Sequence, residues 1–247
     1  MAVQVSITNW AFWCGSNDHA DLKYGAPGVL QSSKTGIDKA DLASGLKPAW
    51  KRRLDLYGRA AAEVLTRTLR TDDNPYIVFA SRHGNIERTV KLLHQVITDE
   101  ALSPADFGMS VHNALVGIAS INWSVTESHT AVAAGPDSLV AGMTEAICQI
   151  NDTNLPVILC YIDLPLPAVY RHLEQGDQTG TALAVRFEPL SHASQSNSYA
   201  VEFGTTSETT RISAPLEAER FAEFLESGLG KHTLFGTNGC WTVTKND

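Results

Sequence analysis

The chain has 247 residues, of which 43% are hydrophobic, and carries a formal net charge of -8 at pH 7. This length is sufficient for one sizeable core, so we expect a single domain over residues 1–247. An acidic chain lacks the cationic surface that nucleic acid or an anionic membrane requires, so neither is an expected partner.

No apolar run approaches the length of a membrane span. The four cysteines are scattered without a CxxC pair, which is typical of reduced thiols and favours a cytoplasmic protein. The histidines show no metal-ligand spacing such as HxxxH, so we expect neither a metal nor another cofactor.

In chain order, residues 3–8 alternate as a strand, whereas 15–48 carry Gly, Pro and Ser with little periodicity, which indicates a long surface excursion. Helical spacing of apolar residues predicts helices over 51–70 and 85–99, on either side of a buried strand at 76–80. Ser103 can cap a further helix and Pro104 suits its first turn; we expect this helix to continue through Ala114 to Ile121.

The next segment, residues 128–146, predicts a strand, a sharp elbow and a helix. Further strands are expected at 157–162, 181–187, 199–203 and 241–243, with a short acidic helix at 216–227. Arg186 and Glu188 alternate with apolar residues in the stretch AVRFE, a pattern typical of charges on an edge strand, so we expect Arg186 to be an ordinary edge-strand charge. Strands that alternate with helices over the first two thirds predict an α/β layered fold.

The elbow consists of Gly135, Pro136 and Asp137, on a layout where many enzymes place a nucleophile. A cysteine here would be activated by the helix N-terminus, but these residues are instead good helix starters. Ser138 has only Asp137 beside it as a base, and Cys148 lies roughly 18 Å along the helix. We therefore interpret the elbow as structural.

Ser81 and His83 follow the strand at 76–80, where α/β folds place active sites. A hydroxyl and an imidazole this close in sequence seldom face each other, and no acid that would orient the histidine is evident. A polar turn is therefore the favoured interpretation. Residues 28–35 approach a phosphate-binding loop, but they lack its second glycine and its flanking strand and helix.

Several segments together resemble the β-ketoacyl synthases, condensing enzymes of the thiolase fold. Residues 52–61 (RRLDLYGRAA) resemble the family's "RRMDxF…AA" helix, and 103–121 (SPADFGMSVHNALVGIASI) resemble the "SPxF…S…NxxxGxxSI" segment before its catalytic strand. Residues 234–239 (LFGTNG) are similar to its "GFGGTN" loop with one glycine missing. The resemblance is best over residues 50–150, with a possible C-terminal strand in 234–247.

The resemblance implies a thiolase-like fold of helices and mixed sheet, truncated relative to full synthases. Counting without gaps from Asn113 places the family's nucleophilic cysteine at Pro136, and we find no segment like the half of the synthase that carries its two catalytic histidines. An inactive homologue of this kind is similar to the chain length factors, and "FASRHG" with "VHNAxxG" resembles those of aryl polyene clusters.

The resemblance implies a non-catalytic subunit that pairs with an active ketosynthase as a heterodimer or a dimer of heterodimers and meets the acyl carrier protein indirectly. Its implied role is to shape the acyl tunnel in polyene, polyketide or fatty-acid-like chain elongation. The resemblance implies a tunnel wall over 106–112 and a pairing strand over 128–134. The tunnel residues are then Asp106, Phe107, Met109 and His112, and the interface residues are Ser128, His129, Thr130, Ala131, Val132, Ala133 and Ala134. His112 is equally consistent with an ordinary structural role.

A fold that lacks half of its layers is expected to leave an apolar sheet face or edge uncovered, so the dimer would be obligate and would bury on the order of a few thousand Å². Two other interpretations stay open. One is a stand-alone hydrolase or acyltransferase that uses Ser81 with His83, or Ser138. The other is a homodimeric acyl-binding protein.

Overall fold

The computed structural model describes residues 2–16, 19–71, 73–174, 179–192, 197–205 and 214–246. The strands are β1 (Ala2–Gly15), β2 (Ala20–Ala26), β3 (Val29–Lys34), β4 (Tyr76–Ala80), β5 (His129–Val132), β6 (Val157–Asp163), β7 (Gly180–Pro189), β8 (Ser198–Gly204), β9 (Lys231–Phe235) and β10 (Cys240–Lys245). The α-helices are α1 (Pro48–Lys51), α2 (Leu56–Thr68), α3 (Ile86–Ile97), α4 (Pro104–Gly108), α5 (Ala114–Trp123), α6 (Ser138–Thr153) and α7 (Ala214–Ser227). Short 3-10 helices are η1 (Lys39–Asp41), η2 (Gly135–Asp137), η3 (Ala168–Leu173) and η4 (Leu190–His192).

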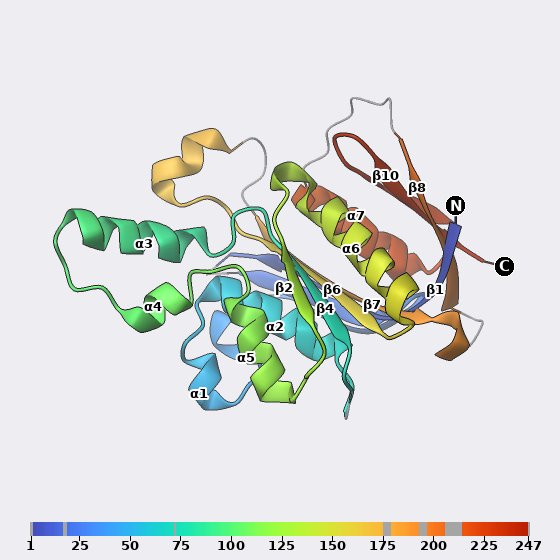
Figure 1. Cartoon of the computed structure of the whole chain (residues 1–247), viewed down its shortest axis with the longest axis horizontal. Coiled ribbons are helices and arrows are strands. Elements are labelled where there is room, and N and C mark those ends of the chain that lie inside the picture. The colour runs from blue at the N-terminus through green and yellow to red at the C-terminus, as the bar shows by residue number, and fades with distance from the viewer. Residues whose placement is uncertain are drawn as a thin grey trace.

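One mixed sheet contains all of the described strands (Figure 1). Its order is β5-β4-β6-β7-β1-β8-β10-β9, with the β2–β3 hairpin attached to β1. β4 runs parallel to both β5 and β6, whereas the remaining pairs are antiparallel. β5 therefore lies at one end of the sheet, and no other described strand pairs with its outer edge.

The central strands read as nearly continuous apolar runs because both of their faces are buried. In β4, Ile77 and Phe79 point into one core, whereas Val78 and Ala80 point into the other. Alternation of side chains along a strand produces this division, and it continues through β6 and β7.

Helices cover both faces of the sheet. α2 and α5 pack on one face, and α6 and α7 lie together on the other (Figure 1). The expectation of an uncovered apolar sheet face is therefore wrong, because the C-terminal helix α7 returns to cover β1 and β7 beside α6. The expectation of an open edge is met by β5.

Side-chain caps fix where three helices begin. Asp55 accepts from the backbone N of Gly58, Asn85 from that of Arg88, and Ser103 from that of Asp106, so each satisfies an otherwise unpaired amide. The predicted helix over 51–70 begins only at Leu56, because Asp55 adopts an extended backbone as its cap. The predicted helix over 103–121 is two helices, α4 and α5, separated by residues 109–113.

The predicted surface excursion over 15–48 is largely wrong. β2 and β3 form a hairpin that pairs with the second half of β1, in a register where Trp10 faces Gly25 and Trp13 faces Leu22. The side chains of β3 are mostly exposed, so the strand shows no apolar periodicity. Its strand conformation depends on pairing with a segment that lies earlier in the chain.

Arg186 is not an edge charge. It is 2% exposed in β7, a strand with neighbours on both sides. Its guanidinium forms ion pairs with Asp73 and with Glu188, whose carboxylate also accepts from Arg70 at 2.6 Å. Burial of the cation is thus offset by two carboxylates, as an interior charge requires.

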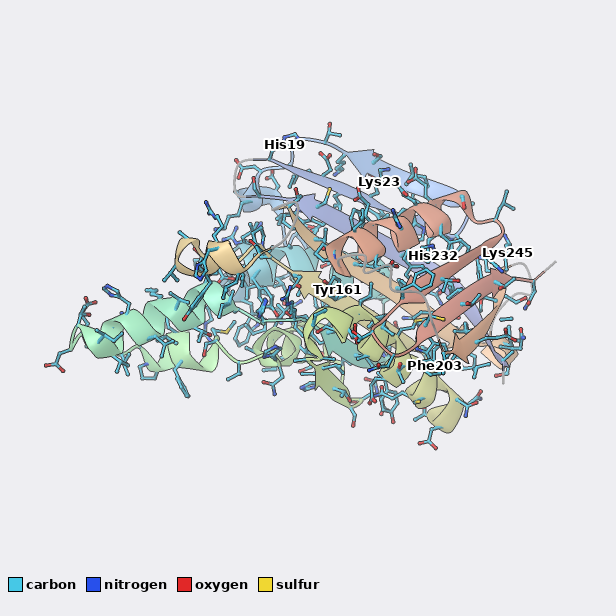
Figure 2. All side chains as sticks on the ribbon, turned by 90° about the horizontal axis from the view of Figure 1, so that it is seen from above. His19, Lys23, Tyr161, Phe203, His232 and Lys245 are labelled. Atoms are coloured by element: carbon cyan, nitrogen blue, oxygen red, sulfur yellow. The ribbon has the colours of Figure 1, made fainter. Side chains whose placement is uncertain are left out.

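The segment over residues 86–113, which we call the arm, projects from the body of the molecule (Figures 1 and 2). It contains α3 and α4, and of the residues in these two helices only Leu92 is buried. Its exposed large apolar side chains are Leu93, Val96, Ile97, Leu102, Phe107 and Val111. The apolar side chains of α3 are therefore present at helical spacing, but half of them face solvent and only Leu92 is buried.

Candidate functional site

The elbow lies between β5 and α6, as predicted, and its three residues form the 3-10 helix η2. Gly135 has a φ of +58°, a left-handed conformation that favours glycine, and so allows the sharp bend. Asp137 does not cap its own helix. Instead its Oδ1 accepts hydrogen bonds from the backbone N and from Oγ1 of Thr237, both at 3.0 Å.

This contact brings together two segments that the sequence singled out separately. Thr237 belongs to the C-terminal loop at 234–239, and the hydrogen bonds to Asp137 close that loop over the elbow. Gly236 in the same loop approaches Val140 so closely that a Cβ at position 236 would lie 3.2 Å from its Cγ1. Trp241 then donates from Nε1 to Thr144 on α6 at 2.8 Å.

The two candidate serine nucleophiles are held in structural roles. Ser138 is fully buried; its Oγ accepts from Ala134 N at 3.1 Å and donates to the carbonyl of Gly135 at 2.7 Å. Ser81 is also fully buried, and its Oγ accepts from Gly84 N at 3.0 Å. Neither hydroxyl is presented to a substrate in this arrangement.

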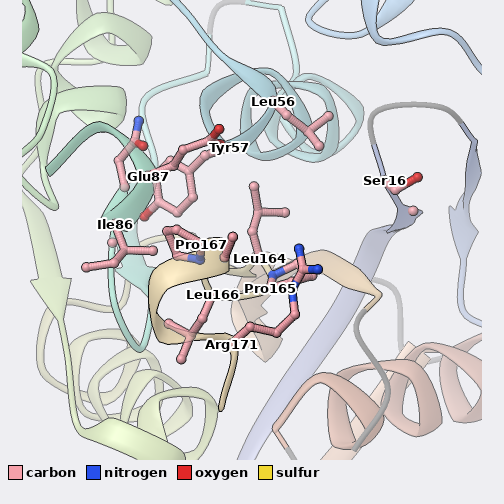
Figure 3. A pocket seen from close by; sticks show the side chains of 14 residues that line it. Ser16, Leu56, Tyr57, Ile86, Glu87, Leu164, Pro165, Leu166, Pro167 and Arg171 are labelled. Atoms are coloured by element: carbon pink, nitrogen blue, oxygen red, sulfur yellow. The ribbon is translucent and has the colours of Figure 1, made fainter. Parts of the chain in front are cut away.

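A pocket of about 330 Å³ lies where β1, β4 and β6 give way to loops (Figure 3). The first turns of α2 and α3 form one part of its wall, and residues 164–171 form another. Its lining is mostly apolar and includes Leu56, Ile86, Leu164 and Leu166, and Arg171 also lines it (Figure 3).

Titratable side chains gather near this pocket at the carboxyl ends of β4 and β6. Burial raises the pKa of Asp163 to about 7, although the positive charge of Arg82 acts to lower it. The hydroxyl of Tyr161 lies 3.4 Å from Oδ2 of Asp163. Burial, reinforced by Arg82, lowers the pKa of His83. These groups therefore tend toward their neutral forms near pH 7.

Sequence reasoning identified only part of this region. It recognised Ser81 and His83 at the end of a strand, but it missed Asp163 and also Tyr57, a residue of α2 that lines the pocket, because both come from distant segments. The rule that α/β sheets place polar sites at strand carboxyl ends would have pointed to Asp163, which is the last residue of β6.

The predicted tunnel residues all lie on the arm, but they have different surroundings. Asp106 forms ion pairs with Arg88 and Lys91. Phe107 is 67% exposed, whereas Met109 packs partly against the core that contains α2 and α5. His112 lies against Gly84, where an added Cβ would come within 2.8 Å of its Cε1.

The predicted interface residues form β5 and its flanks. The strand itself is shorter than expected, spanning His129–Val132 within the predicted range 128–134. Its inner edge pairs with β4, and the side chains of His129 and Ala131 are exposed whereas those of Thr130 and Val132 are half-buried. A strand of this kind offers unpaired backbone groups to another chain.

Among the described residues, no three His, Cys, Asp or Glu side chains converge as metal ligands would. Within the same residues no helix is long and apolar enough to cross a membrane.

Solved structures with the same architecture place the chain in the thiolase-like class of α/β folds. A complex of a ketosynthase (ApeO) with its chain length factor (ApeC) from Xenorhabdus doucetiae matches at a TM-score of 0.73 and 24% identity, covering 98% of this chain and 99% of that chain. The ishigamide ketosynthase/chain length factor matches at a TM-score of 0.58 and 14% identity, over 92% and 74% of the two chains. AntDE:AntF, a type II acyl-carrier protein in complex with its ketosynthase, matches at 0.65 and 10%, with 100% of both chains covered.

Identities this low show the fold alone, and no curated protein sequence matches. The family model described as the N-terminal domain of β-ketoacyl synthases matches residues 30–239, which is most of the chain. The chain therefore belongs to the β-ketoacyl synthase family.

Proposed function

We propose that this chain is a non-catalytic subunit that pairs with an active ketosynthase and shapes the tunnel in which the growing acyl chain is held. The elbow is the observation on which the proposal rests. Where the family resemblance places a nucleophilic cysteine, the chain has Pro136, and the polar side chains of Asp137 and Ser138 are engaged in structural hydrogen bonds. A condensing enzyme needs a thiolate to carry the acyl chain, and neither a proline ring nor these side chains can supply one.

Two exposed features support a partner. The outer edge of β5 presents unpaired backbone groups, and the arm presents a row of apolar side chains, among them Ile97 at 83% exposure. An open strand edge favours pairing with another strand, and an apolar surface of this kind favours burial against protein. We assign Ser128 to Ala134 to the strand pair and the arm to contact with the ketosynthase.

α4 and the residue that follows it supply the residues for a tunnel wall. Phe107 is a large apolar side chain that this chain leaves mostly exposed, which suits a side chain that is buried in a partner. Met109 is flexible and can fill an irregular space, so in this proposal it stops the acyl chain at a fixed depth.

The similar structures are described as ketosynthases with a chain length factor or with an acyl-carrier protein. By analogy with these, we infer that the product is a polyene or polyketide chain, that the carrier protein meets the complex through the ketosynthase, and that the complex works in the cytoplasm. This analogy adds to the argument from the elbow and does not replace it.

Co-expression with a ketosynthase encoded nearby tests the proposal. We expect the two chains to purify together, the complex to condense acyl thioesters, and this chain alone to be inactive. Condensation or thioester hydrolysis by the isolated chain would overturn the proposal. Labelling of the isolated chain by a serine-reactive probe, lost in Ser81→Ala, would favour a hydrolase instead.

A further inference from the structure

We propose that Arg88 is a positioning residue that clamps the arm to the body, and through its ion pair with Asp106 sets where Phe107 and Met109 lie in the partner's tunnel. This inference rests on the proposed function, and it assigns specificity to residues that need not touch the acyl chain themselves.

The arm has little apolar attachment of its own: besides Leu92, only Met109 among its described residues packs against a core, and only partly. α4 contains no buried residue, and Leu92 is the single buried residue of α3. Apolar burial therefore does little to fix the angle at which the arm leaves the body. Polar contacts with defined geometry must do most of this work.

Arg88 supplies those contacts at the root of the arm. Its side chain is 12% exposed. Its Nη1 lies 2.5 Å from Asp106 Oδ1 on α4, and its Nε and Nη2 lie 3.2 and 3.0 Å from Asp55 Oδ2. Its Nη2 also donates to the carbonyl of Arg53 at 3.2 Å. One guanidinium thus joins α3, α4 and the residue that caps α2.

The body side of this clamp is rigid. Asp55 caps α2 by accepting from Gly58 N and also accepts from Asn85 Nδ2 at 2.7 Å. α2 in turn has most of its residues buried in the core. The planar guanidinium, with its fixed donor directions, therefore transmits the position of α2 to α4.

The arm side depends on one carboxylate. Asp106 accepts from Arg88 and, through its other oxygen, from Lys91 at 3.3 Å, and Lys91 is exposed. Phe107 follows Asp106 directly, and Met109 lies one turn further. Neutralising Asp106 would therefore free α4 and the residues that follow it while leaving the pair between Arg88 and Asp55 intact.

Hydrogen exchange of the free chain tests the clamp without any partner. In Asp106→Asn the amides of Phe107, Met109 and Ser110, which bond within and just after α4, should exchange roughly tenfold faster, within the range expected when a charge-assisted hydrogen bond is lost. Arg67→Gln is the matched control. It removes an ion pair to Glu63 that is also 2.5 Å long, but Arg67 lies roughly 18 Å from Asp55 along α2, and the substitution should leave these amides unchanged.

Product analysis of the complex with ketosynthase tests the specificity. Asp106→Asn and Arg88→Lys should broaden the distribution of chain lengths measured by mass spectrometry. Asp106→Glu, which keeps the carboxylate, should give a distribution closer to that of the wild type. Arg67→Gln should give the wild-type distribution. Faster exchange with an unchanged length distribution would overturn the role in specificity, and unchanged exchange would overturn the clamp. If the wild-type chain binds no ketosynthase, the proposed function fails, and the exchange experiment still decides whether the clamp exists.

Discussion

Replacement of Ala131 by proline is expected to block pairing with a ketosynthase while leaving this chain folded. The reason is the alternation of backbone groups along β5. Ile77 N donates to the carbonyl of Ser128, and Ser81 N donates to that of Val132. In a parallel pair, every second residue of a strand bonds to the same neighbour, so the even-numbered residues of this segment bond to β4. The N–H groups of His129, Ala131 and Ala133 therefore point toward the open edge.

Proline at position 131 would thus remove a donor that this chain does not use. Its ring would also project into the space, about 4.8 Å away, where a partner strand would lie. A net hydrogen bond contributes ~0.5–1.5 kcal/mol, and the steric block adds to that loss, so we expect at least about a tenfold increase in Kd. Thr130, which precedes the substitution, is already in a strand and so suits a position before proline.

Two variants complete the experiment. Ala131→Ser keeps the N–H and should bind as the wild type does. Thr130→Pro removes an N–H that faces β4 and should lower the melting temperature of the free chain, which Ala131→Pro should leave nearly unchanged. The affinity is measured by titration with a purified ketosynthase. If folded Ala131→Pro binds with wild-type affinity, β5 is not the pairing strand.

Two further substitutions have outcomes that the structure makes specific. Met109→Gly should lengthen the products of the complex and Met109→Trp should shorten them, because the side chain at this position would set the depth of the tunnel; unchanged products from both variants, measured by mass spectrometry, would remove Met109 from the gate. Asp163→Asn should change how stability depends on pH. Burial raises the pKa of Asp163 to about 7, so the folded protein retains a proton that the unfolded chain loses near pH ~4. The wild type therefore loses stability as pH rises from ~4 to ~7, and relative to Asp163→Asn it should lose ~2 kcal/mol between pH ~5.5 and ~7 in urea unfolding. Parallel stability curves for the two proteins would contradict this assignment.

Elements with strong local patterns could be predicted from the sequence. The stretch Tyr76–Ala80 is wholly apolar because both of its faces are buried, and the polar breaks beside it fix its ends. The helix over 85–99 has helical periodicity and an Asn cap, and the observed α3 matches it within a few residues. What the pattern could not reveal is that half of the apolar side chains of this helix face solvent, because periodicity does not identify the surface against which an apolar face packs.

Elements that depend on distant partners were missed. β3 has mostly exposed side chains and is a strand because it pairs with β2, which itself pairs with β1. The same limit applies to the site. The residues of the elbow could be identified directly, but the contact between Asp137 and Thr237 joins positions 100 residues apart. The burial of Asp163, which changes its pKa, likewise depends on packing that no local window contains.

The arrangement of layers separates the stability of this fold from its proposed assembly. A half-synthase with a bare sheet face would need its partner in order to complete a core. Here α7 covers the sheet beside α6, and among the residues of α6 that are not buried, Thr144, Glu145 and Asp152 are polar. Apolar groups left exposed for a partner include those of the arm, such as Leu93, Ile97 and Phe107, and the open strand β5 contributes little to either core. We therefore expect substitutions on β5 and the arm to change binding far more than folding, which is the condition under which the Ala131 and Asp106 variants can be interpreted.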